Sequence, residues 1–593
     1  MPTAHLGSVR AVSAKPVALR RSRTAPANRA CNATRPLRVV RAVVESDSSP
    51  ANITLSEAVP EGESDATGCP FTAMKNAVDF ESKAGFANLK SKAVEAVGAP
   101  TPIPGPRPLP LDYWQNTFQV LKIPIYGIEE ACLRFHQSYG KIARFNNFGV
   151  GWTFVTDPEI VEHICSKNSK NYMERYLPDV YSYITEGKGI LGSTGKYNQK
   201  HRAMCKPPFQ KTNILKDFAG TASSKASHMV DSWLMMPEGE IVVDAATDMQ
   251  RLTLDFVGLA AFSFDFGGCN QTRNEVMGKA RDDADANQLV DAINESMEMI
   301  GRVFLTPEPL LRAMNAVGEP NVRKMNAALE DMRTLVEPVI QERRRMIQAG
   351  EDVPADLMTA LIEAQEEGEN FGDDELWEDV HDVMGAGHET TANTLTAALW
   401  EVASNPEIDA KISRELKEVL GGKMPTFDDY PNLVYTTQVI KETLRLYPSI
   451  PLFPRKVAAD DRVPGNFEIP AGDVVFMSSY AMGRSAALWD EPYEFRPERF
   501  SPEEEKARHN FAWVPFGAGP RMCMGANFAM MSTTLIMATI LQRMKFSPIA
   551  PTERSNTQGN IPFLGAWRGG MPFEFDMTMR FPTGVSLKGT RRE

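Results

Sequence analysis

Residues 516–525 read Phe-Gly-Ala-Gly-Pro-Arg-Met-Cys-Met-Gly, and the remaining signals in the chain are weighed against this stretch. Its single cysteine, Cys523, stands among glycines, two residues after Arg521. A nearby cation and the N–H groups of a turn that enters a helix lower the pKa of a thiol. Gly519 and Gly525 would let the backbone pass close to a flat ring system where a Cβ would collide. The pattern suits a thiolate ligand of a haem iron, and it also suits a buried structural cysteine in a glycine-rich turn.

The composition is that of a large globular protein. The chain has 593 residues, of which 42% are hydrophobic and 9% aromatic, so it can bury a large core. Its net charge of -12 argues against a nucleic-acid binder. The seven cysteines form no CxxC, zinc or CxxCH pattern, which predicts a reducing compartment.

The N-terminal region differs in charge from the rest. Residues 1–44 contain eight arginines and one lysine but no acidic residue, and they lack a secretory apolar segment. This composition predicts an organelle transit peptide, for the chloroplast rather than the mitochondrion because no amphipathic Arg/Leu helix is visible; a disordered basic tail is the alternative. Residues 45–103 follow as a partly disordered linker. A stiff proline-rich segment at 100–110 leads into a catalytic domain expected over residues 104–593.

Beyond the linker, the pattern predicts a mainly α fold with a minor β region. The short β-like runs 142–148 and 152–155 are split by glycines and predict a hairpin. Apolar residues that recur every three or four places predict helices at 158–164, 248–262 and 321–347. No apolar run reaches the roughly 20 residues of a membrane helix, so we expect at most peripheral membrane contact.

A long helix is predicted over residues 374–403, and its middle, residues 385–391, reads Gly-Ala-Gly-His-Glu-Thr-Thr. Glycine costs about 1 kcal/mol in a helix interior, so a ligand or a closely packed neighbouring helix must compensate. Thr390 can turn its hydroxyl onto a carbonyl one turn back, and Glu389 beside it would make a proton-delivery pair. His388 is expected at the surface or behind the site, because no second metal ligand stands at a suitable spacing.

A charged cluster is the third signal. Glu442 and Arg445 lie three residues apart near the end of a helix that Pro448 terminates. As an exposed pair they would contribute only about 0.3 kcal/mol. Arg499, in the stretch Phe-Arg-Pro-Glu-Arg-Phe at 495–500, could complete a buried Glu–Arg–Arg cluster, since planar guanidinium groups satisfy a carboxylate better than lysine does.

The acid–threonine helix, Glu-x-x-Arg, Pro-Glu-Arg-Phe and Phe-x-x-Gly-x-Arg-x-Cys-x-Gly follow in an order that resembles the cytochrome P450 family of haem-thiolate monooxygenases. The resemblance covers roughly residues 104–580. It implies the cytochrome P450 fold, haem (iron protoporphyrin IX) as cofactor, and insertion of one oxygen atom from O2 into an apolar substrate. It also implies a separate electron donor, such as ferredoxin or a flavoprotein reductase, because no flavin, nicotinamide or ferredoxin-like motif is visible.

The resemblance also implies roles for single residues. Cys523 would be the axial ligand of the iron, and Thr390 with Glu389 would supply protons during dioxygen activation. Three further residues would brace the segment that supports the cysteine loop, namely Glu442, Arg445 and Arg499. The residues that would contact the haem are Arg521, Arg455, Phe516, Gly519, Gly525, Tyr197 and Arg202.

Two family patterns are altered in this chain. Gly483-Arg484 stands where a His-Arg pair is common, which affects no catalytic role, and the second change concerns the helix over the haem. The family usually has Trp-x-x-x-Arg on the helix over one haem propionate. Tyr197 and His201 stand at those two places here, and Arg202 follows. Either His201 or Arg202 could therefore meet the propionate.

Within the family, residues 255–262 and 446–448 look similar to eukaryotic clans that include plastid carotenoid ring hydroxylases. We therefore expect a terpenoid, carotenoid or lipid substrate, in a pocket formed by residues 171–191, 235–245 and 561–567. The alternatives are an isomerase or dehydratase of the same fold that acts on a hydroperoxide, a non-catalytic haem-binding sensor, and a helical interaction protein without a cofactor.

Overall fold

The computed structural model describes residues 100–105, 128–147, 150–279, 285–303, 306–366, 371–549, 573–575, 578–581 and 583–592. The predicted transit peptide, most of the predicted linker and the predicted pocket segment 561–567 lie outside these residues. Everything that follows refers to the described part of the chain.

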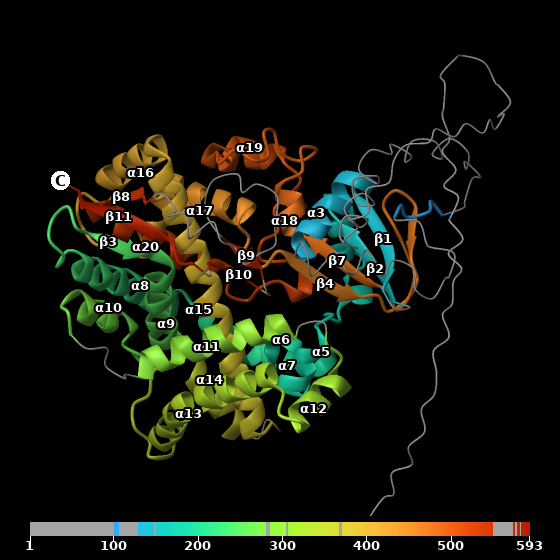
Figure 1. The fold of residues 1–593 in the computed structure, drawn as a ribbon, viewed down its shortest axis with the longest axis horizontal. Coiled ribbons are helices and arrows are strands. Elements are labelled where there is room, and N and C mark those ends of the chain that lie inside the picture. The colour runs from blue at the N-terminus through green and yellow to red at the C-terminus, as the bar shows by residue number, and fades with distance from the viewer. Residues whose placement is uncertain are drawn as a thin grey trace, which may run out of the picture. The chain divides into compact units, whose positions relative to one another are not determined.

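Helices make up most of the described chain, as predicted, and enclose its largest core (Figure 1). The long helix α15 (Asp373–Ser404) runs through the middle of the helical region and packs along α9 (Ala245–Phe262). Fully buried side chains such as Leu252, Leu395 and Leu535 fill the space between these helices and their neighbours. Those neighbours are α8 (Thr212–Trp233), α17 (Val434–Leu446) and α20 (Ala526–Arg543).

The predicted helix boundaries agree with the structure to within a few residues at most ends. The predicted helix 321–347 is α13 (Pro320–Gln348), and the predicted helix 158–164 is α4 (Pro158–Glu162), which continues into a π-helical turn at His163–Lys167. The other α-helices are α3 (Ile128–Tyr139), α5 (Asp179–Thr185), α6 (Gly189–Gly192), α7 (Gly195–Cys205), α10 (Gly268–Val276), α11 (Asp285–Arg302), α12 (Glu308–Ala316), α14 (Leu357–Glu366), α16 (Pro406–Val419), α18 (Ser479–Gly483) and α19 (Pro502–Ala507).

The minor β region is mainly one four-stranded sheet of order β1-β2-β7-β4, which lies beside α3 in Figure 1. β1 (Ile142–Asn147) and β2 (Val150–Val155) form the predicted antiparallel hairpin. β7 (Val474–Ser478) pairs parallel with β2, and β4 (Leu452–Lys456) pairs antiparallel with β7. The smaller sheets are formed by β3 (Val242–Asp244), β11 (Ser586–Arg591) and β8 (Met544–Pro548), by β5 (Asp461–Val463) and β6 (Phe467–Ile469), and by β9 (Glu574–Phe575) and β10 (Met579–Arg580).

A buried carboxylate joins α8, α9 and α10. Asp255 on α9 accepts hydrogen bonds from the first two N–H groups of α10, at 2.6 Å from Gly268 and 2.9 Å from Cys269. The ammonium group of Lys225 on α8 lies 3.2 Å from the same carboxylate. A charge at this depth is tolerated because a helix N-terminus and a cation both neutralise it.

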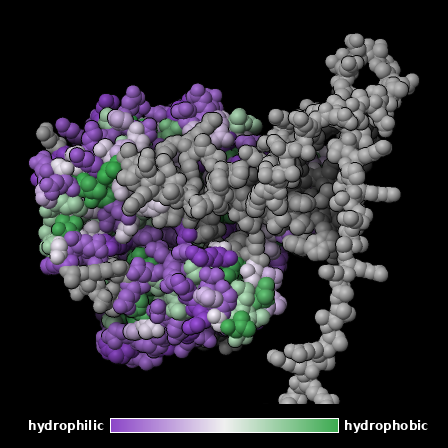
Figure 2. Space-filling model, viewed as in Figure 1, coloured by the Kyte–Doolittle hydropathy of each residue, from purple (hydrophilic) through white to green (hydrophobic). Residues whose placement is uncertain are grey.

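The visible surface of the described helices is mostly hydrophilic, with small separate apolar areas (Figure 2). Among the described helices, none combines the length and the apolar character that a membrane-spanning segment needs.

Replacing Asp255 with alanine should strongly destabilise the protein, because Lys225 would lose its buried carboxylate and keep only the exposed Asp265, and α10 would lose its cap. We expect a loss of about 3 kcal/mol or more in the free energy of unfolding, measured by urea denaturation. Asp265→Ala is the matched control, since Asp265 contacts the same ammonium at 2.6 Å but its side chain is 44% exposed. Equal free energies of unfolding for Asp255→Ala and Asp265→Ala would contradict the role of Asp255 in joining the three helices.

Candidate active site

A cavity of about 760 Å³ lies against α15, β4 and the loop 516–525. Much of its wall is apolar and comes from segments far apart in the sequence, including Leu177, Ile190, Phe218, Val257, Phe476 and Phe528. Cys523 and Thr390 both line this cavity. The two segments that carry the strongest sequence signals therefore meet at one place.

The loop before α20 holds Cys523 at the cavity wall. The Cys523 N–H donates to Phe516 O at 2.9 Å and closes the loop. Of the five cysteines in the described part of the chain, Cys523 alone is exposed, and it lines the cavity. Phe516 and Gly525 line the cavity beside it, as predicted for residues next to a ligand.

The electrostatics of this thiol differ from expectation. Cys523 is exposed to the cavity, but the thiol lies deep within the protein, and this desolvation raises its pKa against the lowering effects of the Gly525 N–H and of the Arg175 and Arg202 guanidinium groups. The prediction that Arg521 lowers the pKa of Cys523 is wrong. Arg175 and Arg202 are the arginines that lower it, and burial outweighs them. Coordination to a metal would deprotonate the thiol despite this shift.

Gly519 has another role than the predicted one. Its φ is +69°, and a Cβ there would lie 1.9 Å from the carbonyl oxygen of Cys165 in the π-helical turn. The residue does not line the cavity. Gly519 is therefore required where two backbone segments meet, and the prediction that it faces a flat ring is wrong.

Four arginine side chains converge on the cavity: Arg175, Arg202, Arg455 and Arg521. Within the described chain their guanidinium groups donate only to backbone carbonyls, and no carboxylate pairs with them. The Nε atom of Arg521 is buried without a partner. Burial lowers the pKa of all four, that of Arg521 to about 10, and repulsion between guanidinium groups adds to the effect at three of them.

Such a cluster fits a ligand with carboxylate groups, because bidentate carboxylate contacts would neutralise cations that the protein leaves unpaired. Arg455 comes from β4 and Arg521 from the cysteine loop, and both were predicted to contact the ligand. Arg175 is not marked by any sequence motif. It enters the site through a backbone bridge to Arg455 and hydrogen bonds to Leu191 O and Arg521 O.

The structure shows which residue of the altered Trp-x-x-x-Arg pattern on α7 faces the cavity. Arg202 lines the cavity and donates to Met522 O at 2.8 Å. His201 points elsewhere and pairs through Nδ1 with the buried Asp379. Tyr197 stacks on His201, with ring centroids 4.1 Å apart, and does not line the cavity. Arg202 is therefore the α7 residue placed to meet a bound anion, and the position of Tyr197 does not favour its predicted contact.

On α15, the Thr390 hydroxyl donates to Ala386 O at 2.6 Å, which is the predicted bond to the preceding turn. Both residues line the cavity. Glu389 is only 5% exposed and lies behind this wall. The acid and the alcohol are neighbours, but only the alcohol faces the cavity.

The small residues of this helix serve two purposes. A Cβ at Gly387 would lie 2.9 Å from a methyl group of Val257 on α9, so the glycine allows close helix packing as well as lining the cavity. His388 was predicted to lie at the surface or behind the site, and the structure excludes the surface position. His388 is fully buried, and burial lowers its pKa to about 4, so it is neutral at physiological pH.

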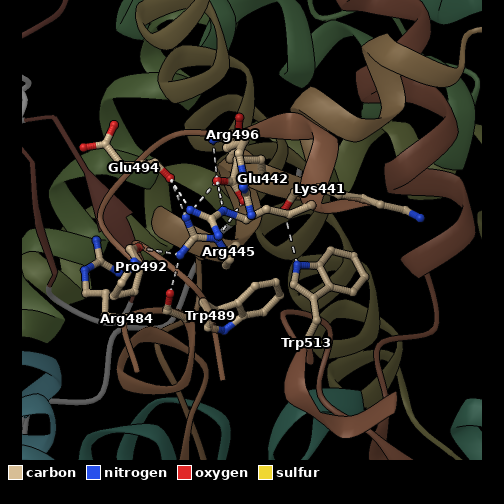
Figure 3. A network of polar contacts seen from close by, with 12 residues as sticks. Lys441, Glu442, Arg445, Arg484, Trp489, Pro492, Glu494, Arg496 and Trp513 are labelled. Atoms are coloured by element: carbon tan, nitrogen blue, oxygen red, sulfur yellow. Dashed lines mark hydrogen bonds and ion pairs between the residues drawn. The ribbon is translucent and has the colours of Figure 1, made fainter. Parts of the chain in front are cut away.

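The predicted Glu–Arg–Arg cluster is fully buried. Figure 3 shows Glu442 and Arg445 of this cluster with the polar contacts between them. Glu442 accepts two hydrogen bonds from Arg445, at 2.6 and 2.7 Å, and Arg499 Nε lies 3.3 Å from it. Arg445 also donates to Pro492 O at 2.6 Å and to Glu494 O at 2.9 Å. These bonds attach α17 to the segment that leads to the cysteine loop.

The predicted pocket segments are only partly correct. Residues 171–191 contribute to the cavity wall through Arg175, Tyr181 and Leu191, among others. Residues 235–245 do not contribute, because they lead into β3, which pairs with β11 in another sheet.

Comparisons with known proteins agree with this arrangement. The family model for cytochrome P450 matches residues 104–564. The chain is 27% identical over 440 residues to LUTEIN DEFICIENT 5, chloroplastic, from Arabidopsis thaliana, covering 72% of this chain and 70% of the relative. It is 31% identical to human cytochrome P450 4V2, over 64% of this chain and 73% of the relative. It is 25% identical to the chloroplastic carotene epsilon-monooxygenase of Arabidopsis thaliana, over 74% of this chain and 79% of the relative.

Glu442→Gln should greatly destabilise the protein, because two buried guanidinium groups would lose their only shared carboxylate among the described residues. We expect a loss of about 3 to 5 kcal/mol, measured as a lower urea midpoint of unfolding. Glu498→Gln, in the same Pro-Glu-Arg-Phe stretch, is the control. Its side chain is 42% exposed and pairs with Lys411, so the change should stay below about 1 kcal/mol. If both variants unfolded at the wild-type midpoint, the bracing role of Glu442 would be refuted.

Proposed function

The chain belongs to the cytochrome P450 family, and from this membership we propose that it hydroxylates a terpenoid, carotenoid or lipid substrate through Cys523-bound haem. Members of this family are haem-thiolate enzymes, so the protein is an oxidoreductase of the monooxygenase class with haem as its cofactor. The observation that carries the proposal is that Cys523, Thr390 and four unpaired arginines line a single cavity.

Haem supplies the redox chemistry that activates dioxygen, and the chain's residues hold and surround it. Cys523 would ligate the iron. The guanidinium groups of Arg175, Arg202, Arg455 and Arg521 would neutralise its two propionates, which are the anions this cluster lacks. Glu442, Arg445 and Arg499 would keep the cysteine loop in position from behind.

Thr390 and Glu389 would supply protons at the substrate side. The Thr390 hydroxyl donates a hydrogen bond to Ala386 O, which leaves its oxygen free to accept a hydrogen bond in the cavity. Glu389 is the adjacent acid. This pair favours a reaction that consumes protons over the rearrangement of a hydroperoxide, which needs none.

The apolar wall of the cavity supports an apolar substrate. Two of the relatives bear names of plastid proteins, one of them a carotene monooxygenase, and the basic composition of residues 1–44 agrees with a plastid destination. We therefore place the protein in the chloroplast and favour a carotenoid or related terpenoid over other lipids.

The electron donor would bind beside the cysteine loop. Four exposed lysines lie on α7 and the segment that follows, namely Lys196, Lys206, Lys211 and Lys216. Arg202 links the same helix to the loop through Met522 O. A basic surface next to Cys523, on a chain of net charge -12, suits an acidic donor such as ferredoxin or a flavoprotein reductase.

The proposed function is tested first by spectroscopy and product analysis. The reduced holoprotein with carbon monoxide should show the Soret band of a thiolate-ligated haem, and Cys523→Ser should lose it. Incubation with plastid carotenoids and lipids, with either ferredoxin and its reductase or a flavoprotein reductase, should give a product that has gained one oxygen atom. Absence of the thiolate-type band in folded wild-type protein would refute the proposal.

Thr390→Ala should uncouple electron consumption from product formation, because the cavity would lose the hydroxyl next to Glu389. We expect roughly a tenfold fall in product per electron pair, with more hydrogen peroxide released. Thr396→Ala is a matched control: its hydroxyl makes the same kind of bond, to Ala392 O at 2.8 Å, but it does not line the cavity. Full coupling in Thr390→Ala would exclude the proposed proton-delivery role.

A further inference from the structure

The first half of α15 carries carboxyl groups that the proposed function does not use. Glu378 and Asp382 lie four residues apart, and Glu389 follows seven residues later. At 3.6 residues per turn, all three fall within about 40° of one another around the helix. The side chain of Glu378 is 12% exposed and Glu389 is 5% exposed, so this is a row of largely buried acids. Buried carboxyl groups are costly, and a row of them needs an explanation.

The row connects two hollows of the protein. Asp382 lines the main cavity, as Thr390 does. Glu378 lines a second cleft of about 500 Å³, whose wall is largely polar and includes Arg312, Asn326, Glu330, Arg333 and His381. Along α15, the second cleft lies on the N-terminal side of Asp382, and Thr390 lies on its C-terminal side.

One glycine shows how close Glu378 and Asp382 lie. Gly189 begins α6, which packs against α15, and its φ is +75°. A Cβ built there would lie 2.5 Å from an Asp382 carboxyl oxygen and 3.4 Å from Cβ of Glu378. The backbone at Gly189 therefore lies over both acids and separates them from solvent on the side where α6 packs.

The hydrogen bonding of the two acids is incomplete. Asp382 accepts from the Leu191 N–H at 2.7 Å. The Oε2 atom of Glu378 is buried and has no hydrogen-bond partner within the described chain. His381 Nδ1 lies 4.0 Å from this oxygen and also lacks a hydrogen-bond partner among the described residues. Burial lowers the pKa of His381 to about 4, so it supplies no positive charge.

These surroundings favour carboxyl groups that exchange protons near neutral pH. Burial, and then Asp382, raises the pKa of Glu378 to about 8; Asp374 adds to this, and Lys188 and Arg333 oppose it. Burial raises the pKa of Asp382 to about 7, with a contribution from Asp379 and opposition from Arg175 and the N–H groups of Ile190 and Leu191.

Tyr181 connects this pair to the acid–alcohol pair. Tyr181 and Asp382 both line the main cavity. Burial raises the pKa of the Tyr181 phenol, and the negative charges of Asp382 and Glu389 add to this effect. A phenol hydroxyl can accept a proton at its oxygen and donate its own, so it can serve as a step between carboxyl groups.

We propose that Glu378 and Asp382 form a proton inlet from the second cleft to Glu389 and Thr390. The proposal rests on the monooxygenase function, whose balanced reaction is RH + O2 + 2 H⁺ + 2 e⁻ → ROH + H2O, with the electrons supplied by the redox partner. Each proton binds Glu378 from solvent in the cleft, passes to Asp382, and reaches Glu389 through the Tyr181 hydroxyl. Each carboxyl group then returns to its earlier protonation state, and no other co-reactant is consumed.

The test uses Glu378→Gln and Asp382→Asn in the holoprotein. Both substitutions keep the size of the side chain, and asparagine can still accept from the Leu191 N–H, but neither amide can carry the proton. Asp373→Asn is the control on the same helix, since Asp373 is 61% exposed and pairs with Arg344.

Two readouts are needed. Infrared difference spectra of the resting holoprotein should show protonated carboxyl absorption that disappears as pH rises through about 7 to 8, the values for the two acids. Each inlet variant should lose part of this signal, and Asp373→Asn should not. During turnover, product per electron pair should fall roughly tenfold in both inlet variants, with a larger solvent deuterium isotope effect. The substrate Kd, from the spectral shift on binding, should stay unchanged.

The outcomes separate the alternatives. Unchanged infrared titration in both variants would overturn the inlet. A changed substrate Kd with unchanged coupling in Asp382→Asn would also overturn it and make Asp382 a substrate contact. The infrared titration needs no substrate, so a wild-type protein that oxygenates nothing would refute the proposed function, while the titration would still decide whether these acids exchange protons.

Discussion

The structure depends on a carboxylate that has been removed from water. Glu442 is fully buried, and it is held by Arg445, by Arg499 and by the backbone N–H of Arg496 at 2.7 Å. An ion cluster at this depth adds little net stability, because its attraction mainly offsets the desolvation of its charges. What it supplies is geometry: planar donors and carboxylate oxygens match only in one arrangement of α17 and the segment at 490–500. The chain continues from that segment through α19 to the cysteine loop, so this match helps to set the position of the loop.

The helix α15 combines requirements that usually conflict. Gly387 allows it to approach α9 closely, yet the same turn faces a cavity through Ala386 and Thr390. Carboxyl groups then occupy positions closer to its N-terminus, where an apolar face would pack better. Local rules for a stable helix are broken in one short region, and this region and the cysteine loop line the same cavity.

Features that depend on nearby residues were predictable from the sequence. The β1–β2 hairpin and the Thr390 hydroxyl bond to Ala386 O arise from spacing within a few residues, and the ends of α15 follow from periodicity. Features that depend on distant contacts were not. Arg175 lines the cavity because its backbone forms a β-bridge with Arg455. Gly519 is required because the carbonyl oxygen of Cys165 packs against its Cα and leaves no room for a Cβ. His388 looks suited to a surface position, and its burial depends on the packing of α15 among other helices.

The four arginines that face the cavity also bear on how the protein matures. Without an anion among them, their mutual repulsion and desolvation oppose the final closure of β4, the cysteine loop and the segment around Arg175. Anything that binds the closed state and supplies negative charge shifts the folding equilibrium toward it. If these arginines hold the haem propionates as proposed, haem would supply that charge and stabilise the folded chain, and a cell short of haem would contain more unfolded chain for proteases and chaperones to recognise.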